Sequence, residues 1–122
     1  MNEQTGPEAL WRAALANGRF LLQKGESGGS YVFPPRTMAP GTGADDLHWV
    51  EASGMGQVYS VTVISPKPPL HPYNVVLVDL DEGPRMMSRV TGIAASDVKI
   101  GMRVQARVAN EDGAPILLFE PA

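Results

Sequence analysis

The alternation of apolar and polar residues along the chain predicts a protein built mainly from β-strands. Apolar side chains occupy every second position from Met102 to Val108, with Arg103, Gln105 and Arg107 between them. This period of two is typical of a strand with one buried face. Shorter stretches of the same kind predict further strands at residues 47–51, 57–64, 73–80, 85–90 and 115–120.

Turn signals between these stretches indicate how the strands connect. Asp81-Glu82-Gly83-Pro84 predicts a hairpin turn, residues 110–114 predict another, and residues 94–98 predict a brief helical element. Five or six strands with a short helix in this position are typical of a small Greek-key barrel, the OB-fold. The side chains that we expect in its core are Tyr59, Val61, Val63, Val76, Val78, Val104, Ala106, Val108 and Leu117.

A short helix is predicted before the strands, at residues 6–16. Leu10, Trp11, Ala14 and Leu15 form one apolar stripe at helical spacing. A helix of this length is marginal in isolation, so the stripe has to pack against something. It packs either on the chain's own barrel, which we favour, or on a partner subunit.

Residues 25–43 have a different composition, with five Gly and three Pro among 19 residues. Within this stretch Phe33-Pro34-Pro35-Arg36 cannot be helical, because proline disfavours the helical conformation in itself and in the residue before it. We therefore expect a surface loop or a pair of very short strands. Its few apolar residues do not explain how it holds a shape.

Composition narrows the classes of function. The 122 residues contain no Cys, which excludes disulfides, thiolate–zinc sites and cysteine nucleophiles. A net charge of −3 provides no basic field for nucleic acid. No apolar run approaches the roughly 20 residues of a transmembrane helix, and the first residues do not resemble a secretory signal. We expect a cytoplasmic protein that does not bind membranes.

Few residues offer catalytic chemistry. His48 and His71 are the only imidazoles, and we expect both to be ordinary surface or hydrogen-bonded residues. Asp79, Asp81 and Glu82 cluster at the predicted hairpin. They could act as paired acid–base groups or as a weak cation site. We favour the alternative that they belong to a solvated turn, whose charges discourage pairing at the sheet edge. The sequence therefore predicts no catalytic residue and no metal site.

A series of short motifs carries a resemblance to a known family. They are PEALW (7–11), GRFLL (18–22), FPPR (33–36), LHWV (47–50), SGMGQVYS (53–60), VDLDEGPR (78–85) and IGMRV (100–104). In their order and spacing they resemble the bacterial and archaeal OB-fold proteins that carry an N-terminal rubredoxin-like zinc ribbon and are encoded beside thiolase-type enzymes. The resemblance divides the chain into an N-terminal helix (1–20), a ribbon (21–46) and an OB-fold barrel (47–122).

The chain departs from this family at the zinc ligands. Members carry two C-x-x-C pairs around the Phe-Pro-Pro-Arg motif, and the four positions correspond here to Gly25, Gly28, Ala39 and Thr42. A structural zinc contributes about 10–16 kcal/mol of apparent binding energy in small zinc-finger peptides. This chain lacks that contribution, so the resemblance implies a degenerate ribbon without metal, held by its own apolar residues or by a partner.

The resemblance also implies a function. Members are accessory subunits of thiolase-type, hydratase-type and related acyl-CoA enzymes, and they help to bind or channel acyl-CoA. We therefore expect a non-catalytic subunit, in a possible hetero-oligomer, that docks through Trp11, Phe33 and Arg36. The candidate contacts for CoA phosphates are Arg36, Lys67, Arg103 and Arg107, because guanidinium groups match phosphate geometry. An ordinary polar outer face is the alternative, which we favour. No other cofactor is expected.

A single-stranded nucleic-acid-binding module is the alternative function, because OB-folds often bind single strands. That function requires a basic groove and exposed aromatic platforms. The acidic balance and the small number of aromatic residues make it the weaker hypothesis.

Overall fold

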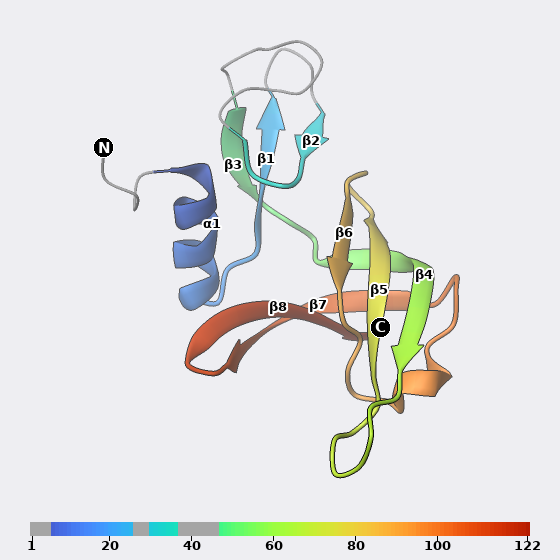
Figure 1. Cartoon of the computed structure of the whole chain (residues 1–122). Helices are drawn as coiled ribbons and strands as arrows, with labels where there is room; N and C mark the ends of the chain where they lie inside the picture. The colour runs from blue at the N-terminus through green and yellow to red at the C-terminus, as the bar shows by residue number, and fades with distance from the viewer. Residues whose placement is uncertain (1–5, 26–29, 37–46) are drawn as a thin grey trace.

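The computed structural model describes residues 6–25, 30–36 and 47–122, which form one helix and two antiparallel sheets (Figure 1). The elements, in chain order, are α1 (Pro7–Ala16), β1 (Leu21–Gly25), β2 (Tyr31–Val32), β3 (Leu47–Glu51), β4 (Met55–Ile64), β5 (Tyr73–Leu80), β6 (Arg85–Ser88), the 3₁₀ helix η2 (Ala95–Asp97), β7 (Arg103–Glu111) and β8 (Ala114–Pro121). The predicted helix and the predicted strands from residue 47 onward agree closely with these bounds, whereas β1 was not predicted.

The larger sheet is the predicted OB-fold barrel. Its strand order is β6-β5-β4-β7-β8, with every neighbouring pair antiparallel. The two edges meet just after β6, where Val90 and Phe119 form a parallel bridge. The backbone N–H of Phe119 donates to the carbonyl of Arg89 at 3.0 Å, and that of Thr91 donates to the carbonyl of Phe119 at 2.8 Å.

A buried asparagine reinforces this closure. The side chain of Asn74, on β5, is 1% exposed. Its Nδ2 donates to the carbonyl of Val90 at 3.1 Å, and its Oδ1 accepts from the Val90 N–H at 2.9 Å. One side chain thus pairs with a backbone segment as another strand would, and its own polar atoms are satisfied.

The strand at residues 47–51 does not join the barrel, contrary to our expectation. β3 pairs with β1 along its whole length, from Leu21 opposite Glu51 to Gly25 opposite Leu47. With β2 it completes a separate three-stranded sheet of order β2-β1-β3, which lies at the top of Figure 1, above the barrel. A strand pattern predicts a strand but does not identify its neighbour.

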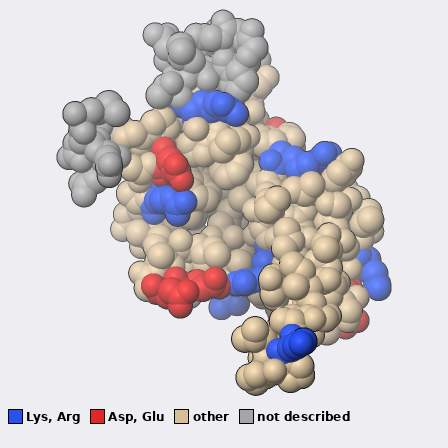
Figure 2. All heavy atoms as spheres, viewed as in Figure 1, with Lys and Arg blue, Asp and Glu red and all other residues tan. Residues whose placement is uncertain are grey.

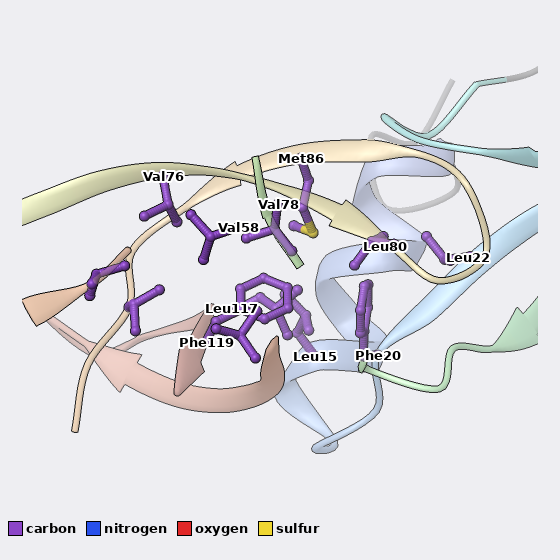
Figure 3. Close-up of a cluster of buried hydrophobic side chains, with 13 residues drawn as sticks. Leu15, Phe20, Leu22, Val58, Val76, Val78, Leu80, Met86, Leu117 and Phe119 are labelled. Atoms are coloured by element: carbon purple, nitrogen blue, oxygen red, sulfur yellow. The ribbon is translucent and has the colours of Figure 1, made fainter. Parts of the chain in front are cut away.

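The core runs through both parts of the molecule. Leu15 of α1, Phe20 and Leu22 lie in the same buried cluster as Val78, Leu117 and Phe119 of the barrel (Figure 3). Leu15 is 2% exposed, and α1 packs on β8. The first of our two alternatives for the helix is therefore confirmed, because its apolar stripe packs on the chain's own barrel.

Seven of the nine predicted core residues are buried or partly buried, and two are exposed. Val76, Val78, Val104 and Leu117 are buried, and Val61, Ala106 and Val108 pack partly buried against them.

Tyr59 is 50% exposed and Val63 is 41% exposed, so their assignment to the core is wrong. A bulge between Val58 and Ser60 shifts the register of β4 against β5, so Val58 turns inward and Tyr59 outward. Val63 lies near the end of β4, opposite the second residue of β5.

The Ser-Gly-Met-Gly motif allows β4 to begin close to its neighbours. Gly54 has φ of +78°, a conformation that favours glycine. A Cβ on Gly56 would lie 2.6 Å from Val78 Cγ1 and 2.8 Å from the carbonyl oxygen of Asp79. The motif thus reflects close packing of the barrel. In the described residues, no helix has the length and hydrophobicity needed to cross a lipid bilayer.

We predict that Val104→Asp abolishes cooperative folding. Val104 is fully buried on β7, and an unpaired buried charge costs several kcal/mol against a total stability of about 5–15 kcal/mol. Thr62→Asp, on the exposed face of β4, is the matched control and should melt near the wild-type midpoint. Thermal unfolding followed by circular dichroism measures both, and an unchanged midpoint for Val104→Asp would contradict the assignment of this core.

Candidate functional site

Two of the predicted partner-binding residues lie against each other. The rings of Trp11 on α1 and Phe33 after β2 have centroids 5.4 Å apart and are inclined by 59°. The indole Nε1 of Trp11 donates to the carbonyl of Leu21 at 3.0 Å. Both rings remain partly exposed. The pair therefore connects the helix to the small sheet while presenting an aromatic surface.

The third residue, Arg36, is positioned by a glutamine that the sequence analysis missed. Gln23 on β1 is 5% exposed. Its Oε1 accepts from the Arg36 N–H at 2.6 Å, and its Nε2 donates to the Arg36 carbonyl at 2.7 Å. This clamp fixes the end of the Phe33–Arg36 segment, and the Arg36 residue itself is exposed. The sequence offers no clear signal for this role, because Gln23 stands beside a second polar residue, Lys24, in β1.

The structure describes only one of the four positions that correspond to zinc ligands. Gly25 ends β1, where it is buried and its N–H donates to the carbonyl of Ser30 at 3.0 Å. Gly28, Ala39 and Thr42 lie outside the described residues. Within the described ranges, no group of three or more His, Asp or Glu side chains could hold a metal ion.

A groove opens beside the Trp11–Phe33 pair, with a volume of about 370 Å³. We call it the α1–β6 groove, because it lies between α1 and the edges of the barrel at β6 and β8. Its lining residues are Trp11, Arg12, Leu15, Phe33, Met86, Met87, Ser88, Arg89, Pro115, Ile116, Leu117 and Leu118. Figure 2 shows this face of the molecule hollowed between the helical part and the barrel.

The carboxylates of the β5–β6 hairpin each have a partner. Asp79 pairs with Arg85 at 2.6 Å, and Asp81 accepts two hydrogen bonds from Arg103, both at 2.8 Å. Glu82 accepts from the backbone N–H of Ser53 at 2.6 Å and from its hydroxyl at 3.2 Å. These pairs support the interpretation of the hairpin as an ordinary turn, and they tie it to the segment that follows β3.

These contacts shift the pKa values of Asp81, Arg85 and Arg103 in the directions expected for ion pairs. The hydrogen bonds from Arg103 hold the pKa of Asp81 below its usual value, and Asp81 in turn raises the pKa of Arg103. The Asp79 carboxylate raises the pKa of Arg85, whose guanidinium also lies 3.4 Å from the centre of the Tyr59 ring. Because all three groups are on the surface, the pairs contribute little to stability.

The remaining predicted residues are spread over the molecule. Lys67 lies on the β4–β5 loop, at the end of the molecule opposite the small sheet that holds Arg36 (Figure 1). Arg107 is exposed on β7, four residues beyond the paired Arg103. His48 and His71 are both exposed. The four candidate phosphate contacts thus do not form one cluster.

Comparison with known proteins identifies the family. The family model for the C-terminal OB-fold domain of ChsH2 matches residues 49–109. A DUF35 domain-containing scaffold protein of Pyrococcus furiosus is 30% identical over 112 residues, which cover 84% of this chain and 82% of that protein. The chain belongs to the ChsH2/DUF35 family of OB-fold proteins. The resemblance inferred from the motifs is confirmed.

A second relative is much longer than this chain. A probable enoyl-CoA hydratase alpha subunit of Thermomonospora curvata is 38% identical over 99 residues, which cover 79% of this chain but only 31% of that protein. The similarity therefore concerns one part of the hydratase subunit.

Two solved structures share the fold. A chain of the Ltp2-ChsH2(DUF35) aldolase superposes with a TM-score of 0.82 and 33% identity, over 99% of this chain and 96% of that one. A DUF35-family protein of unknown function from Sulfolobus solfataricus superposes with a TM-score of 0.69 at 18% identity, a likeness of fold alone. The DUF35 architecture of helix, small sheet and OB-fold thus extends over nearly the whole chain.

We predict that the purified protein holds no stoichiometric zinc, because all four ligand positions lack a thiolate. Restoring the set with Gly25→Cys, Gly28→Cys, Ala39→Cys and Thr42→Cys should confer about one zinc per chain, the occupancy of a four-thiolate site. Elemental analysis after dialysis measures both proteins, and a chelator should leave the wild-type melting midpoint unchanged. Tightly held zinc in the wild type would contradict the prediction.

We also predict that Gln23→Met loosens the Phe33–Arg36 segment. Methionine has a similar shape but cannot pair with the Arg36 N–H and carbonyl, and losing such partners costs about 1–3 kcal/mol. Amide hydrogen exchange should accelerate in residues 31–36, while the barrel strands β4 and β5 keep their protection. Gln57→Met, at an exposed position on β4, is the control. Unchanged exchange in residues 31–36 would show that the clamp has no structural role.

Proposed function

We propose that this protein is a non-catalytic scaffold subunit of an acyl-CoA enzyme complex, with a thiolase-type or hydratase-type enzyme as its partner. The observation that carries the proposal is the superposition of nearly the whole chain on a chain of the Ltp2-ChsH2(DUF35) aldolase. Two curated relatives are named as scaffold proteins and another as a hydratase subunit. These names agree in indicating a subunit of a larger assembly.

The described residues support a binding role. The histidines are separate and exposed, and the clustered carboxylates are each engaged by an arginine or by Ser53. The Ser53 hydroxyl donates to Glu82 at 3.2 Å, but the same carboxylate accepts from the Ser53 N–H at 2.6 Å, so this contact serves to hold the hairpin. We infer that the partner enzyme performs the chemistry and that this chain contributes surfaces.

We propose Trp11, Phe33 and Arg36 as the centre of the docking surface. Aromatic and arginine side chains are the usual anchors of protein interfaces. The Trp11–Phe33 contact holds the two rings, and the Gln23 clamp holds the backbone of Arg36, before any partner binds. A preorganised surface loses less conformational entropy on binding, which favours affinity.

Contact with CoA itself is a further part of this proposal. Arg36, Lys67, Arg103 and Arg107 remain candidates, but Arg103 is already engaged by Asp81 and Lys67 lies at the far end from Arg36. We therefore propose that one CoA meets only a subset of them and that the partner enzyme supplies the other phosphate contacts. A single-stranded nucleic-acid function is disfavoured, since the arginine stacked on Tyr59 is neutralised by Asp79.

Docking is tested by co-purification with a co-expressed thiolase-type or hydratase-type enzyme. We predict that Trp11→Ala and Arg36→Ala each weaken the association by about tenfold or more, the usual effect of losing an interface anchor. Arg36→Ala should keep the melting midpoint within a few degrees, because the Gln23 clamp uses only the backbone of this residue.

Two control variants separate docking from folding. Trp11→Phe keeps an aromatic ring but removes the hydrogen bond to Leu21, so it should retain more binding than Trp11→Ala. Lys99→Ala, beyond η2 on the barrel, should bind like the wild type. Full partner binding by Trp11→Ala and Arg36→Ala would refute this docking surface, and loss of the folded barrel in either would assign that residue to internal packing.

A further inference from the structure

The α1–β6 groove combines apolar walls with an exposed methionine. Met86 is 5% exposed and belongs to the core, whereas its neighbour Met87 is 68% exposed at the edge of the groove. Methionine side chains adapt to irregular partner surfaces and are common where proteins bind one another. Trp11 and Phe33 also line the groove, so it is continuous with the proposed docking surface.

The charged residues that line the groove are all basic. Arg12 and Arg89 are the only charged residues among those that line it, and no acidic residue does. Arg12 pairs with Glu8, with side-chain exposures of 60% and 70%, and Arg89 pairs with Glu111, with exposures of 31% and 48%. Exposed ion pairs contribute little free energy, so each arginine can exchange its own carboxylate for one from a partner at small cost.

We infer that the α1–β6 groove receives an acidic, apolar segment of the partner enzyme: an apolar side chain fills the groove and flanking carboxylates pair with Arg12 and Arg89. This inference rests on the proposed scaffold function and names the chemistry of the partner's contact. It adds Met87 and Arg89, which the sequence analysis did not select, to the binding surface.

Two other occupants fit the observations less well. A second copy of the chain would bring the carboxylates of its β5–β6 hairpin together with Arg85 and Arg103, which pair with them. These arginines would then face Arg12 and Arg89 with the same charge, which is unfavourable. An acyl chain would need a site that encloses most of its surface, whereas this groove lies open between α1 and the barrel edges.

The first test measures affinity for the co-purifying acyl-CoA enzyme. Met87→Ala and Arg89→Glu should each weaken binding by about tenfold or more. Added salt should weaken wild-type binding more than binding by Arg89→Glu, because that variant has lost a charge contact. Ile100→Ala, whose side chain is 70% exposed elsewhere on the barrel, and Lys99→Glu, at an exposed position next to it, are matched controls and should bind like the wild type.

The second test identifies what meets the arginine. In the Arg89→Lys variant a carbodiimide can join the introduced amine to a carboxylate in direct contact. Peptide mapping of the cross-linked complex should find that amine on an Asp or Glu of the partner enzyme next to apolar residues. A cross-link only to Glu111, together with unchanged affinity of Met87→Ala and Arg89→Glu, would overturn the inference and leave the scaffold function standing.

Other results identify another occupant or remove the basis of the inference. Quenching of Trp11 fluorescence by octanoyl-CoA, lost in Met87→Ala, would assign the groove to an acyl ligand. A dimer in sedimentation that Met87→Ala dissociates would assign it to a second copy. Failure of every tested acyl-CoA enzyme to bind the wild-type chain would overturn both the scaffold function and this inference.

Discussion

The structure depends on one hydrophobic cluster shared between the helix, the first strand and the barrel. Leu15 and Leu22 reach it from the N-terminal part, and Leu117 and Phe119 from the last strand. Burial of such side chains contributes about 1.5–3 kcal/mol each, which a helix of 10 residues and a three-stranded sheet could not obtain alone. The N-terminal part is therefore positioned by the barrel, and the Trp11–Phe33 pair takes its place from this core.

Polar contacts help the small sheet to keep its form. The Gln23 amide offers one donor and one acceptor to a single residue, Arg36, from a site that is almost fully buried. Such a clamp is weaker than a zinc site but has an equally defined geometry. It acts on the Phe-Pro-Pro-Arg segment, which carries Phe33 and Arg36, two of the proposed docking residues.

Much of the fold could be predicted from the sequence, because period-two alternation and turn residues report local conformation. The helix and the barrel strands follow from such signals, whereas the missing zinc ligands are implied only by the resemblance of the motifs to a family. The bulge beside Val58, the pairing of β3 with β1 and the partner of Gln23 do not, since each depends on residues brought together by folding. The same limit applies to Arg103, a predicted phosphate contact, since its pairing with Asp81, 22 residues away, could not be predicted from the sequence.

The distribution of charge explains why recognition by this molecule should depend on shape as much as on electrostatics. Asp79, Asp81 and Glu82 hold the β5–β6 hairpin against β7 and against the segment after β3. Those carboxylates order the barrel rim and leave no acidic cluster there for a cation. In the α1–β6 groove, by contrast, the arginines stand beside aromatic and thioether side chains. A partner that matched only the charge or only the apolar surface would gain part of the available contact, so the combination selects a segment that carries both.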